Sequence, residues 1–557
     1  MVFKSIVPSV DIPSVDVASF CIGASRANIE SADTVAYYDL GTKESQTFGQ
    51  LETAHAHIGS GLVNRLNVQP REVVAVFAAN TVHYASIVLG IISSGAICCT
   101  VSSAFREGEL EYQLKDCGAR TLFVGAAQLR IVLSVLDAGH VDIRSERIVV
   151  VGDPACGSGF TPLHRLLDAR PYQKFRISGP EAAAETPAVI VYSSGTTGLP
   201  KGVVLSHRNL VACAVLNAAS FQFQAAHGPS NEMNSEESAQ RSIAILPFAH
   251  IYGLTSLVTN SVAGGRTQYV MSGRFSVDAF LQAIQDHRIH VASVVPSVLS
   301  QIAKHEHLAR YDLSSLRILG SGAAALPSGV HASIRRRFAV SAANGYGMSE
   351  TSSGVCVMAN YKFAPGSVGI LNPNMEARIV EPGTGRELGV GEEGEFCVRG
   401  PSVMLGYLNR PEETRGVVDD EGFLHTGDIA YIDASGLVFI TDCIKELIKY
   451  KGMQIAPAEL ESILMDHPGV ADAAVIGVDD PGRNSEVPMA LVVPAQQPAD
   501  AAELGREIAA WVAARVADHK RLRGGVVMID AIPRNHSGKI LHRDLRARFN
   551  AQRAAKI

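Results

Sequence analysis

The sequence predicts an α/β protein with a large N-terminal domain of two helix-covered sheets plus a β-rich subdomain, followed by a small α+β domain. The 557-residue chain is several times longer than a typical domain of about 150 residues. Its composition, 47% hydrophobic and 19% charged, supplies the apolar surface for large cores. The rhythm of the sequence also changes twice, near residues 365 and 445. Together these observations predict several packed units rather than one module.

The first part of the chain, residues 34–354, alternates β-branched runs with helical patterns, which is typical of parallel sheets covered by helices. The clearest predicted strands are residues 73–77, 148–151, 188–192, 242–246, 291–295 and 316–319. Residues 80–105 carry no charged side chain and are long enough to cross a membrane. Asn80, His83 and several serines interrupt them, so we expect a helix, a turn and a buried strand instead of an integral membrane segment.

The second part, residues 365–442, is split by glycines into short segments that suit antiparallel strands with tight turns. After residue 445 the sequence predicts helices at 457–465 and 503–516, with strands near 473–478 and 489–493. These elements predict a separate C-terminal domain of just over a hundred residues.

The charge balance excludes some classes of partner. Lys and Arg number 49 and Asp and Glu 55, a formal net charge of −6 with a pI near 6.3. No whole-molecule basic field would draw this chain to nucleic acid or to an anionic membrane. The nine cysteines follow no disulfide or zinc spacing, which favours a reducing compartment. Because the molecule as a whole carries no positive field, any anion-binding site must be a local cluster of positive groups.

Residues 191–202, Val-Tyr-Ser-Ser-Gly-Thr-Thr-Gly-Leu-Pro-Lys-Gly, form the strongest local signal. They follow a predicted strand and precede Ser206, which can cap a helix that begins at His207. Hydroxyl and N–H groups in such a loop can bind phosphate oxygens, although the spacing is not that of a Walker A loop. The residues predicted to bind ATP phosphates here are Ser193, Ser194, Gly195, Thr196, Thr197, Gly198 and Lys201.

Five further segments occur in a fixed order: 246–253 (Leu-Pro-Phe-Ala-His-Ile-Tyr-Gly), 345–350 (Gly-Tyr-Gly-Met-Ser-Glu), 424–428 (Leu-His-Thr-Gly-Asp), 445–452 (Lys-Glu-Leu-Ile-Lys-Tyr-Lys-Gly) and 533–540 (Pro-Arg-Asn-His-Ser-Gly-Lys-Ile). With the loop at 191–202, they make the chain resemble the acyl-adenylate-forming (AMP-binding) enzymes from about residue 30 to its end. This family includes acyl-CoA synthetases, coumarate:CoA ligases, luciferases and peptide-synthetase adenylation domains. Residues 448–461 are most similar to the coumarate:CoA ligases.

The resemblance implies an ATP-dependent carboxylic acid:CoA ligase that forms acyl-AMP and then a thioester. Its expected co-substrates are ATP with Mg²⁺, CoA and a small-molecule acid, either aromatic and cinnamate-like or a medium-chain fatty acid. The implied domains are residues 1–441, a hinge at 442–445 and a mobile C-terminal domain at 446–557.

The resemblance also implies roles for individual residues. Lys539 would bridge the carboxylate and the α-phosphate, Lys449 would serve thioester formation, Glu350 would bind Mg²⁺, and His250 would lie beside the acyl carboxylate. The other implied ATP-binding residues are Gly322, Ala323, Ala324, Gly345, Tyr346, Gly347, Ser349, Asp428, Lys445 and Gln454. The implied acyl pocket contains His250, Tyr252, Ser256 and Ser353, and the implied CoA site contains Arg274, Lys451 and Gly452.

Two positions depart from the family pattern. Cys443 stands where relatives have an arginine that reaches the ribose, and a thiol cannot replace a guanidinium fork. ATP affinity is then weaker, or another cation compensates, or the site is impaired. Residues 351–353 are Thr-Ser-Ser where coumarate ligases tend to have Gly-Pro-Val. An adenylating enzyme with a non-CoA acceptor and a catalytically impaired nucleotide-binding relative therefore remain as alternatives.

The last three residues, Ala555-Lys556-Ile557, are similar to the Ser-Lys-Leu address of peroxisomal proteins. The end of a terminal helix rich in Ala and Lys has the same composition. Both a peroxisomal location, through an import receptor, and a cytoplasmic one are open at this point.

Overall fold

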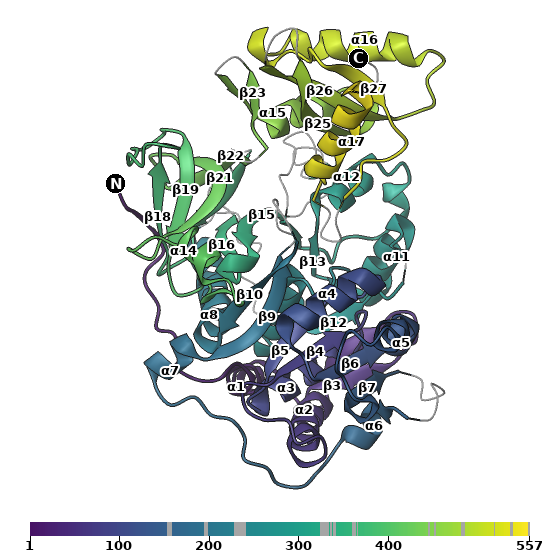
Figure 1. Ribbon diagram of the computed structural model, residues 1–557, viewed down its shortest axis with the longest axis vertical. Coiled ribbons are helices and arrows are strands. Elements are labelled where there is room, and N and C mark those ends of the chain that lie inside the picture. The colour runs from purple at the N-terminus through teal and green to yellow at the C-terminus, as the bar shows by residue number, and fades with distance from the viewer. Residues whose placement is uncertain are drawn as a thin grey trace.

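The computed structural model describes residues 1–557 except 153–158, 194–198, 228–240, 274, 324–333, 335–336, 338–340, 359–363, 365, 444–445, 451–452, 481–484, 517, 535–538 and 555–557. Two large sheets with helices on their faces form the body of the molecule, and a smaller α+β unit lies above them (Figure 1). The predicted α/β fold class is confirmed.

The eight-stranded sheet has the order β20-β10-β9-β5-β4-β6-β7-β8. Its strands are β4 (Val73–Phe77), β5 (Ile97–Val101), β6 (Thr121–Gly125), β7 (Ile148–Val151), β8 (Thr161–Pro162), β9 (Pro187–Ser193), β10 (Lys201–Ser206) and β20 (Gly406–Tyr407). Strands β4 to β9 run parallel, whereas β10 is antiparallel to β9. The sequence analysis did not predict β10, which pairs with β9 as an antiparallel hairpin at the edge of the parallel strands.

The fourteen-stranded sheet joins a parallel half to an antiparallel half. The parallel half contains β2 (Val35–Asp39), β11 (Arg241–Ala244), β12 (Thr267–Val270), β13 (Val291–Val294), β14 (Ile318–Ser321) and β15 (Ser341–Met348). The antiparallel strands are β1 (Phe3–Lys4), β3 (Ser45–Thr47), β16 (Ser353–Met358), β17 (Ser367–Leu371), β18 (Glu376–Val380), β19 (Gly394–Arg399), β21 (Leu424–Ile432) and β22 (Leu437–Cys443). The predicted β-rich subdomain thus continues the larger sheet through the β16–β17 pair.

Helices separate and cover the two sheets. They are α1 (Val17–Asn28), α2 (Phe48–Asn64), α3 (Tyr84–Ser93), α4 (Glu107–Cys117), α5 (Leu129–Asp137), α6 (Leu163–Leu166), α7 (Pro180–Glu185), α8 (His207–His227), α9 (Ile251–Gly253), α10 (Asn260–Ala263), α11 (Val277–His287), α12 (Pro296–Lys304) and α14 (Pro411–Arg415). Every residue of α3 is buried, because α3 lies in the core between the sheets. Helices α4 and α5 cover the outer face of one sheet, and α11 and α12 that of the other.

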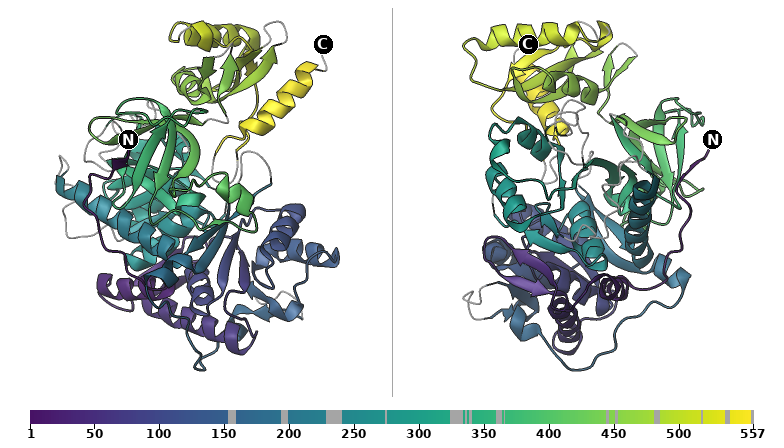
Figure 2. Two further views of the ribbon diagram at one scale, coloured as in Figure 1. Left: turned by 60° about the vertical axis from the view of Figure 1, so that its left-hand side comes forward. Right: turned by 180° about the vertical axis from the view of Figure 1, so that it is seen from behind.

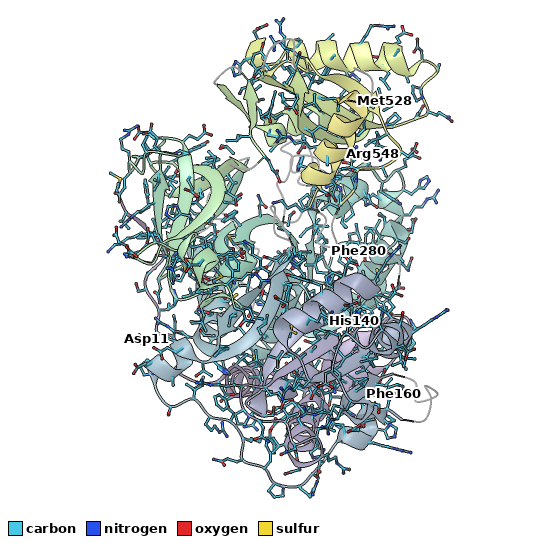
Figure 3. All side chains as sticks on the ribbon, in the orientation of Figure 1. Asp11, His140, Phe160, Phe280, Met528 and Arg548 are labelled. Atoms are coloured by element: carbon cyan, nitrogen blue, oxygen red, sulfur yellow. The ribbon has the colours of Figure 1, made fainter. Side chains whose placement is uncertain are left out.

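The alternation of side chains along each strand produces these layers. Val74 and Val76 of β4 face the core shared by both sheets, whereas Ala75 and Phe77 face the core under α4. Phe280 of α11, labelled in Figure 3, is 1% exposed and packs in the core under α11 and α12.

The predicted helix, turn and strand at 80–105 are α3 and β5. Across the described residues, no helix combines the length and the apolar character needed to cross a membrane.

The C-terminal unit has a core of its own, which contains residues from Ile448 to Phe549. Its elements are β23 (Ile448–Tyr450), β24 (Met453–Ile455), α15 (Pro457–Met465), β25 (Val470–Asp480), β26 (Ser485–Pro494), α16 (Ala501–Ala513), β27 (Gly525–Met528) and α17 (His542–Ala554). Figure 2 shows this unit at one end of the molecule in both views. Lys304 at the end of α12 connects the two parts, because its ammonium donates to the carbonyl oxygens of Val470 and Ala471 at 3.3 and 2.8 Å.

Candidate active site

A single cavity of about 1970 Å³ lies where the two sheets and the C-terminal unit meet. It gathers residues that are more than 300 positions apart in the sequence. The predicted site residues that line it are Ser193, Lys201, His250, Tyr252, Ser256, Gly322, Ala323, Gly345, Tyr346, Gly347, Ser349, Glu350, Ser353, Asp428 and Lys539.

The β9–β10 hairpin carries the predicted phosphate loop. Ser193 ends β9 and pairs directly with Lys201, the first residue of β10, so both ends of the loop are fixed by the sheet. The Lys201 ammonium forms an ion pair with Glu413 and lies 4.9 Å from the centroid of the Tyr407 ring. The positive charge of Lys201 thus lies at the end of the predicted loop, paired with Glu413.

Glu350 lies in the short 3-10 turn η6 (Ser349–Thr351), directly after β15. It is 6% exposed, and the Tyr407 hydroxyl donates to its Oε1 at 2.9 Å. Burial raises the pKa of Glu350, while the Tyr407 and Ser193 hydrogen bonds and the charge of Lys201 oppose that rise. A carboxylate beside hydroxyl groups in a cavity fits Mg²⁺, which prefers oxygen ligands and shares them with phosphates and water.

The backbone around this turn is strained and tightly packed. Ser352 and Ser353 adopt positive φ angles of 55° and 87°, which L-residues rarely adopt and which occur often at functional sites. A Cβ atom on Gly347 would lie 1.7 Å from the Ser353 carbonyl oxygen. Only glycine therefore allows β15 and β16 to approach each other here.

Asp428, the predicted ribose ligand, lies on β21. The Tyr346 hydroxyl donates to its Oδ2 at 2.6 Å. Burial and the nearby Asp428 charge raise the pKa of Tyr346 well above its usual value, so this hydroxyl stays protonated. The backbone of Cys443 on β22 lies directly opposite Asp428 in the strand register. The departure from the family pattern is therefore paired, in the strand register, with the predicted ribose ligand.

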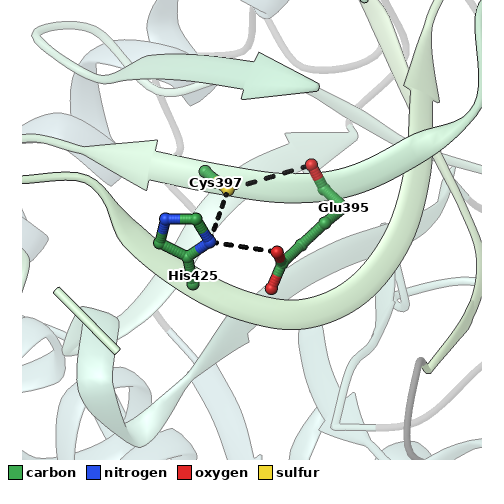
Figure 4. Close-up of side chains that lie close together, drawn as sticks. All are labelled: Glu395, Cys397 and His425. Carbon is green, nitrogen blue, oxygen red and sulfur yellow. Dashed lines mark hydrogen bonds and ion pairs between the residues drawn. The ribbon is translucent and has the colours of Figure 1, made fainter. Parts of the chain in front are cut away.

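Glu395, Cys397 and His425 form a compact group on the neighbouring strands β19 and β21 (Figure 4). His425 Nδ1 lies 3.0 Å from Glu395 Oε2 and 3.4 Å from Cys397 Sγ. The other Glu395 oxygen accepts from the Gly427 N–H at 3.2 Å. The hydrogen bond to Glu395 raises the pKa of His425. This group holds the turn that presents Asp428 to the cavity.

The predicted acyl end of the cavity lies along α9, the π-helical turn η4 (Leu254–Thr259) and α10. The Tyr252 N–H donates to His250 Nδ1 at 3.3 Å, and burial lowers the pKa of His250 to about 4, so the imidazole is neutral at pH 7. A Cβ on Gly322 would lie 3.3 Å from the Tyr252 ring, which explains the small residue at that position. A π-helical turn is frequent at functional sites, and this one carries Ser256.

Lys539 comes to the cavity from the C-terminal unit. Its ammonium lies 3.9 Å from Glu446 Oε1. The other carboxylate oxygen of Glu446, Oε2, lies 3.3 Å from His542 Nδ1, and His542 Nε2 lies 2.7 Å from Glu461 Oε1. These contacts connect the predicted catalytic lysine to the residues that follow the predicted hinge.

Comparison with known proteins decides the family. The AMP-binding enzyme model matches residues 25–408, and the AMP-binding enzyme C-terminal domain model matches residues 459–539. The chain belongs to the AMP-binding enzyme family. The resemblance drawn from the sequence motifs is confirmed.

Curated relatives of this AMP-binding enzyme match over nearly their whole length. The 4-coumarate–CoA ligase-like 9 of Oryza sativa subsp. japonica is 38% identical and covers 98% of this chain and 95% of its own. The 4-coumarate–CoA ligase of Pinus taeda is 34% identical, covering 99% of this chain and 98% of its own.

Solved structures share the fold of this AMP-binding enzyme. An anthranilate CoA ligase in complex with anthranoyl-AMP superposes with a TM-score of 0.85 at 24% identity, covering 98% of this chain and 99% of its own. A benzoate CoA ligase from Burkholderia xenovorans LB400 gives 0.80 at 25% identity, covering 95% and 99%.

Several predicted residues of this AMP-binding enzyme lie outside the described residues and stay predictions. They are Ser194, Gly195, Thr196, Thr197, Gly198, Arg274, Ala324, Lys445, Lys451, Gly452 and the C-terminal Ala555-Lys556-Ile557, together with the side chains of Cys443, Lys449 and Gln454.

The structure also adds residues that the sequence analysis of this AMP-binding enzyme missed. Tyr407 contacts the predicted Glu350 and Glu446 contacts the predicted Lys539. Glu395 holds the N–H of Gly427, next to Asp428, and His542 pairs with Glu446. Glu446 and His542 lie within or next to recognised motifs, so their proximity to Lys449 and Lys539 was an available signal. Tyr407 carried no comparable signal in a short Gly-Tyr strand.

Proposed function

We propose that this AMP-binding enzyme is an ATP-dependent carboxylic acid:CoA ligase acting on cinnamate-like aromatic acids or medium-chain fatty acids. One observation carries the proposal: a single cavity brings Lys539, Glu350 and Asp428 together with the neutral His250. The full-length match to relatives named 4-coumarate–CoA ligase supports the same class. We further propose residues 1–441 and 446–557 as the two domains and 442–445 as the hinge.

In the first step a carboxylate oxygen of the acid attacks the α-phosphorus of ATP. The bond to the bridging oxygen breaks, which gives acyl-AMP and pyrophosphate. Two anions must meet, so the site has to hold them in line and spread positive charge over them. Lys539 and Lys201 supply that charge, and Asp428 and Tyr346 position the ribose. When bound at Glu350, Mg²⁺ would neutralise phosphate charge, with hydroxyl groups such as that of Ser193 nearby.

In the second step the CoA thiol loses its proton and attacks the acyl carbon, and AMP leaves. We propose that rotation at the hinge then replaces Lys539 by Lys449 at the cavity. Arg274, Lys451 and Gly452 are the proposed CoA contacts. We assign these three residues to CoA from the family motifs alone.

A panel of acids tests the proposed function. Cinnamate, 4-coumarate, benzoate, acetate and fatty acids from hexanoic to decanoic are incubated with Mg·ATP, with and without CoA. Pyrophosphate release and mass spectrometry of the thioester are the readouts, and Lys539→Ala is the matched inactive control. We expect pyrophosphate and an acyl-CoA product with cinnamates and medium-chain acids. If no acid gives either product, the proposed function is wrong.

The alternatives give different results in the same panel. Cys443 is the observation that motivates them. An adenylating enzyme with another acceptor releases pyrophosphate but forms no acyl-CoA. An impaired relative binds ATP and releases no pyrophosphate with any acid.

A further inference from the structure

The cavity extends well beyond the predicted acyl carboxylate position. One wall is the helical run through α9, η4 and α10, and the other includes the face of the fourteen-stranded sheet. Residues 251–263 span on the order of 20 Å at the usual helical rise. His250 and Tyr252 lie at one end of this run, and Asn260, Gly264 and Arg266 lie at the other.

Arg266 is an unusual residue for such a position. It directly precedes β12 and lines the cavity. Within the described part of the chain, no hydrogen bond or ion pair occupies its guanidinium group. Burial lowers the pKa of Arg266, and no neighbouring carboxylate offsets that effect. Arg266 is only partly exposed. An uncompensated charge that is largely withdrawn from water is costly, so a native protein that keeps one usually provides a counter-ion.

The side-chain amide of Gln268, at the same end of the cavity, is only partly satisfied. Gln268 lies two residues further along, on the same face of the sheet, and is 1% exposed. Its Nε2 donates to the Ser261 hydroxyl at 2.7 Å, but its Oε1 has no partner. Buried polar atoms are nearly always satisfied, so this oxygen marks a polar and incompletely filled end of the cavity. As an acceptor it would meet a carboxylate only through a bridging water.

The chemistry of the ligand that would fill this end of the cavity follows from Arg266. A guanidinium offers a planar fork of N–H donors that matches a carboxylate in both shape and charge. A hydroxyl group would accept a hydrogen bond but leave the positive charge uncompensated. The ligand group is therefore an anion rather than a neutral polar group.

We propose that Arg266 binds a second carboxylate, at the end of the substrate far from the reacting one. This inference rests on the proposed function and narrows its substrate class to α,ω-dicarboxylic acids whose chain is long enough to reach from His250 to Arg266. The first carboxylate would react beside His250, and the second would pair with Arg266.

Matched pairs of acids test this inference. For chain lengths from hexanoic to hexadecanoic acid, kcat/KM is measured for the α,ω-dicarboxylic acid, the ω-hydroxy acid and the plain fatty acid. The wild type should favour the diacid over the fatty acid of its best length by about tenfold to a hundredfold, the range for one charge-assisted pair. Arg266→Leu should reduce this ratio to about one, and Arg266→Lys should keep part of it.

Arg241→Leu is the matched control. Arg241 is an exposed arginine on the neighbouring strand β11 and does not line the cavity. The Arg241→Leu variant should keep the wild-type ratio of kcat/KM for the diacid to kcat/KM for the fatty acid. Because each ratio is measured within one variant, a loss of folded protein does not change it.

A wild-type ratio near one, or the same ratio in Arg266→Leu, overturns the inference. An equal preference for ω-hydroxy acids overturns the argument from charge. In both cases the acids are still activated, so the proposed function stands. Absence of pyrophosphate with every acid instead contradicts the proposed function itself.

Discussion

The proposed nucleotide end and the proposed acyl end of the cavity are built from different kinds of contact. At the nucleotide end each charged group has a partner: Tyr407 binds Glu350, Tyr346 binds Asp428, and Glu413 pairs with Lys201. At the acyl end Arg266 has no such partner among the described residues, and His250 is neutral.

This difference implies that one end of the cavity carries out the reaction and the other end determines which acid is bound. Preorganised charges at the nucleotide end suit a reaction that is the same for every acid. Unsatisfied groups at the acyl end suit a site that only the right acid completes. Substitutions at the first end should change the rate for all acids, whereas those at the second should change which acid reacts.

Replacing Lys539 should have the largest effect. Lys539→Ala removes the charge placed between the two anions, and the loss of one such contact costs about a hundredfold to a thousandfold in rate. Adenylate formation, measured by pyrophosphate release, should fall by that factor, while transfer from preformed acyl-AMP to CoA should be retained. Lys449→Ala should show the opposite pattern. Equal losses in both half-reactions would contradict the assignment of either lysine.

Restoring an arginine at position 443 should strengthen the nucleotide end. The backbone of Cys443 faces Asp428, so Cys443→Arg brings a guanidinium to the predicted ribose position. One charge-assisted hydrogen bond is worth roughly 1.5 to 3 kcal/mol, so the KM for ATP should fall about tenfold to a hundredfold, less where solvent screens the group. An unchanged KM would mean that another residue already fills this role.

Narrowing the acyl end should produce a smaller and selective effect. Valine at Ser353 is a poor probe, because that residue has a φ of 87° and a β-branched side chain would strain it. Ser256 lies on the helical wall, so Ser256→Leu should reduce kcat/KM for longer acids by about tenfold, the effect of one or two methylenes. ATP parameters should not change, and a uniform loss with all acids would contradict this location.

The ion pairs of His542 should make the C-terminal unit sensitive to pH. Burial alone lowers the pKa of His542, but Glu446 and Glu461 outweigh it and raise the pKa from 6.5 to about 10. The stabilisation is therefore complete below about pH 6.5 and is lost as the pH rises toward 10. The difference in free energy of unfolding between wild type and His542→Ala should shrink across that range. His519→Ala, in the same unit, should show no such trend.

The sequence pointed to Lys201, Glu350 and Asp428 but not to Arg266 for a physical reason. Lys201, Glu350 and Asp428 each occur in a motif whose residues are local, so a short segment identifies them. Arg266 is a single arginine before a strand, and its meaning depends on a cavity wall assembled from distant elements. Tyr407 was missed in the same way, because it meets Glu350 only after folding brings residues 57 positions apart together.

The parallel strands were predicted well where periodicity decides the fold. The predicted segments 73–77 and 148–151 coincide with β4 and β7. The join between β16 and β17 was not predicted, because strand pairing across a connection is a tertiary property that neither segment encodes alone.

Labelling the acid carboxylate with oxygen-18 tests the central claim most directly. The most active acid of the panel is used with ATP, Mg²⁺ and CoA, and the products are analysed by mass spectrometry. If a carboxylate oxygen attacks the α-phosphorus, AMP retains one labelled oxygen, the thioester retains the other, and pyrophosphate carries none. Label in pyrophosphate, or unlabelled AMP alongside a formed thioester, would contradict an acyl-adenylate route.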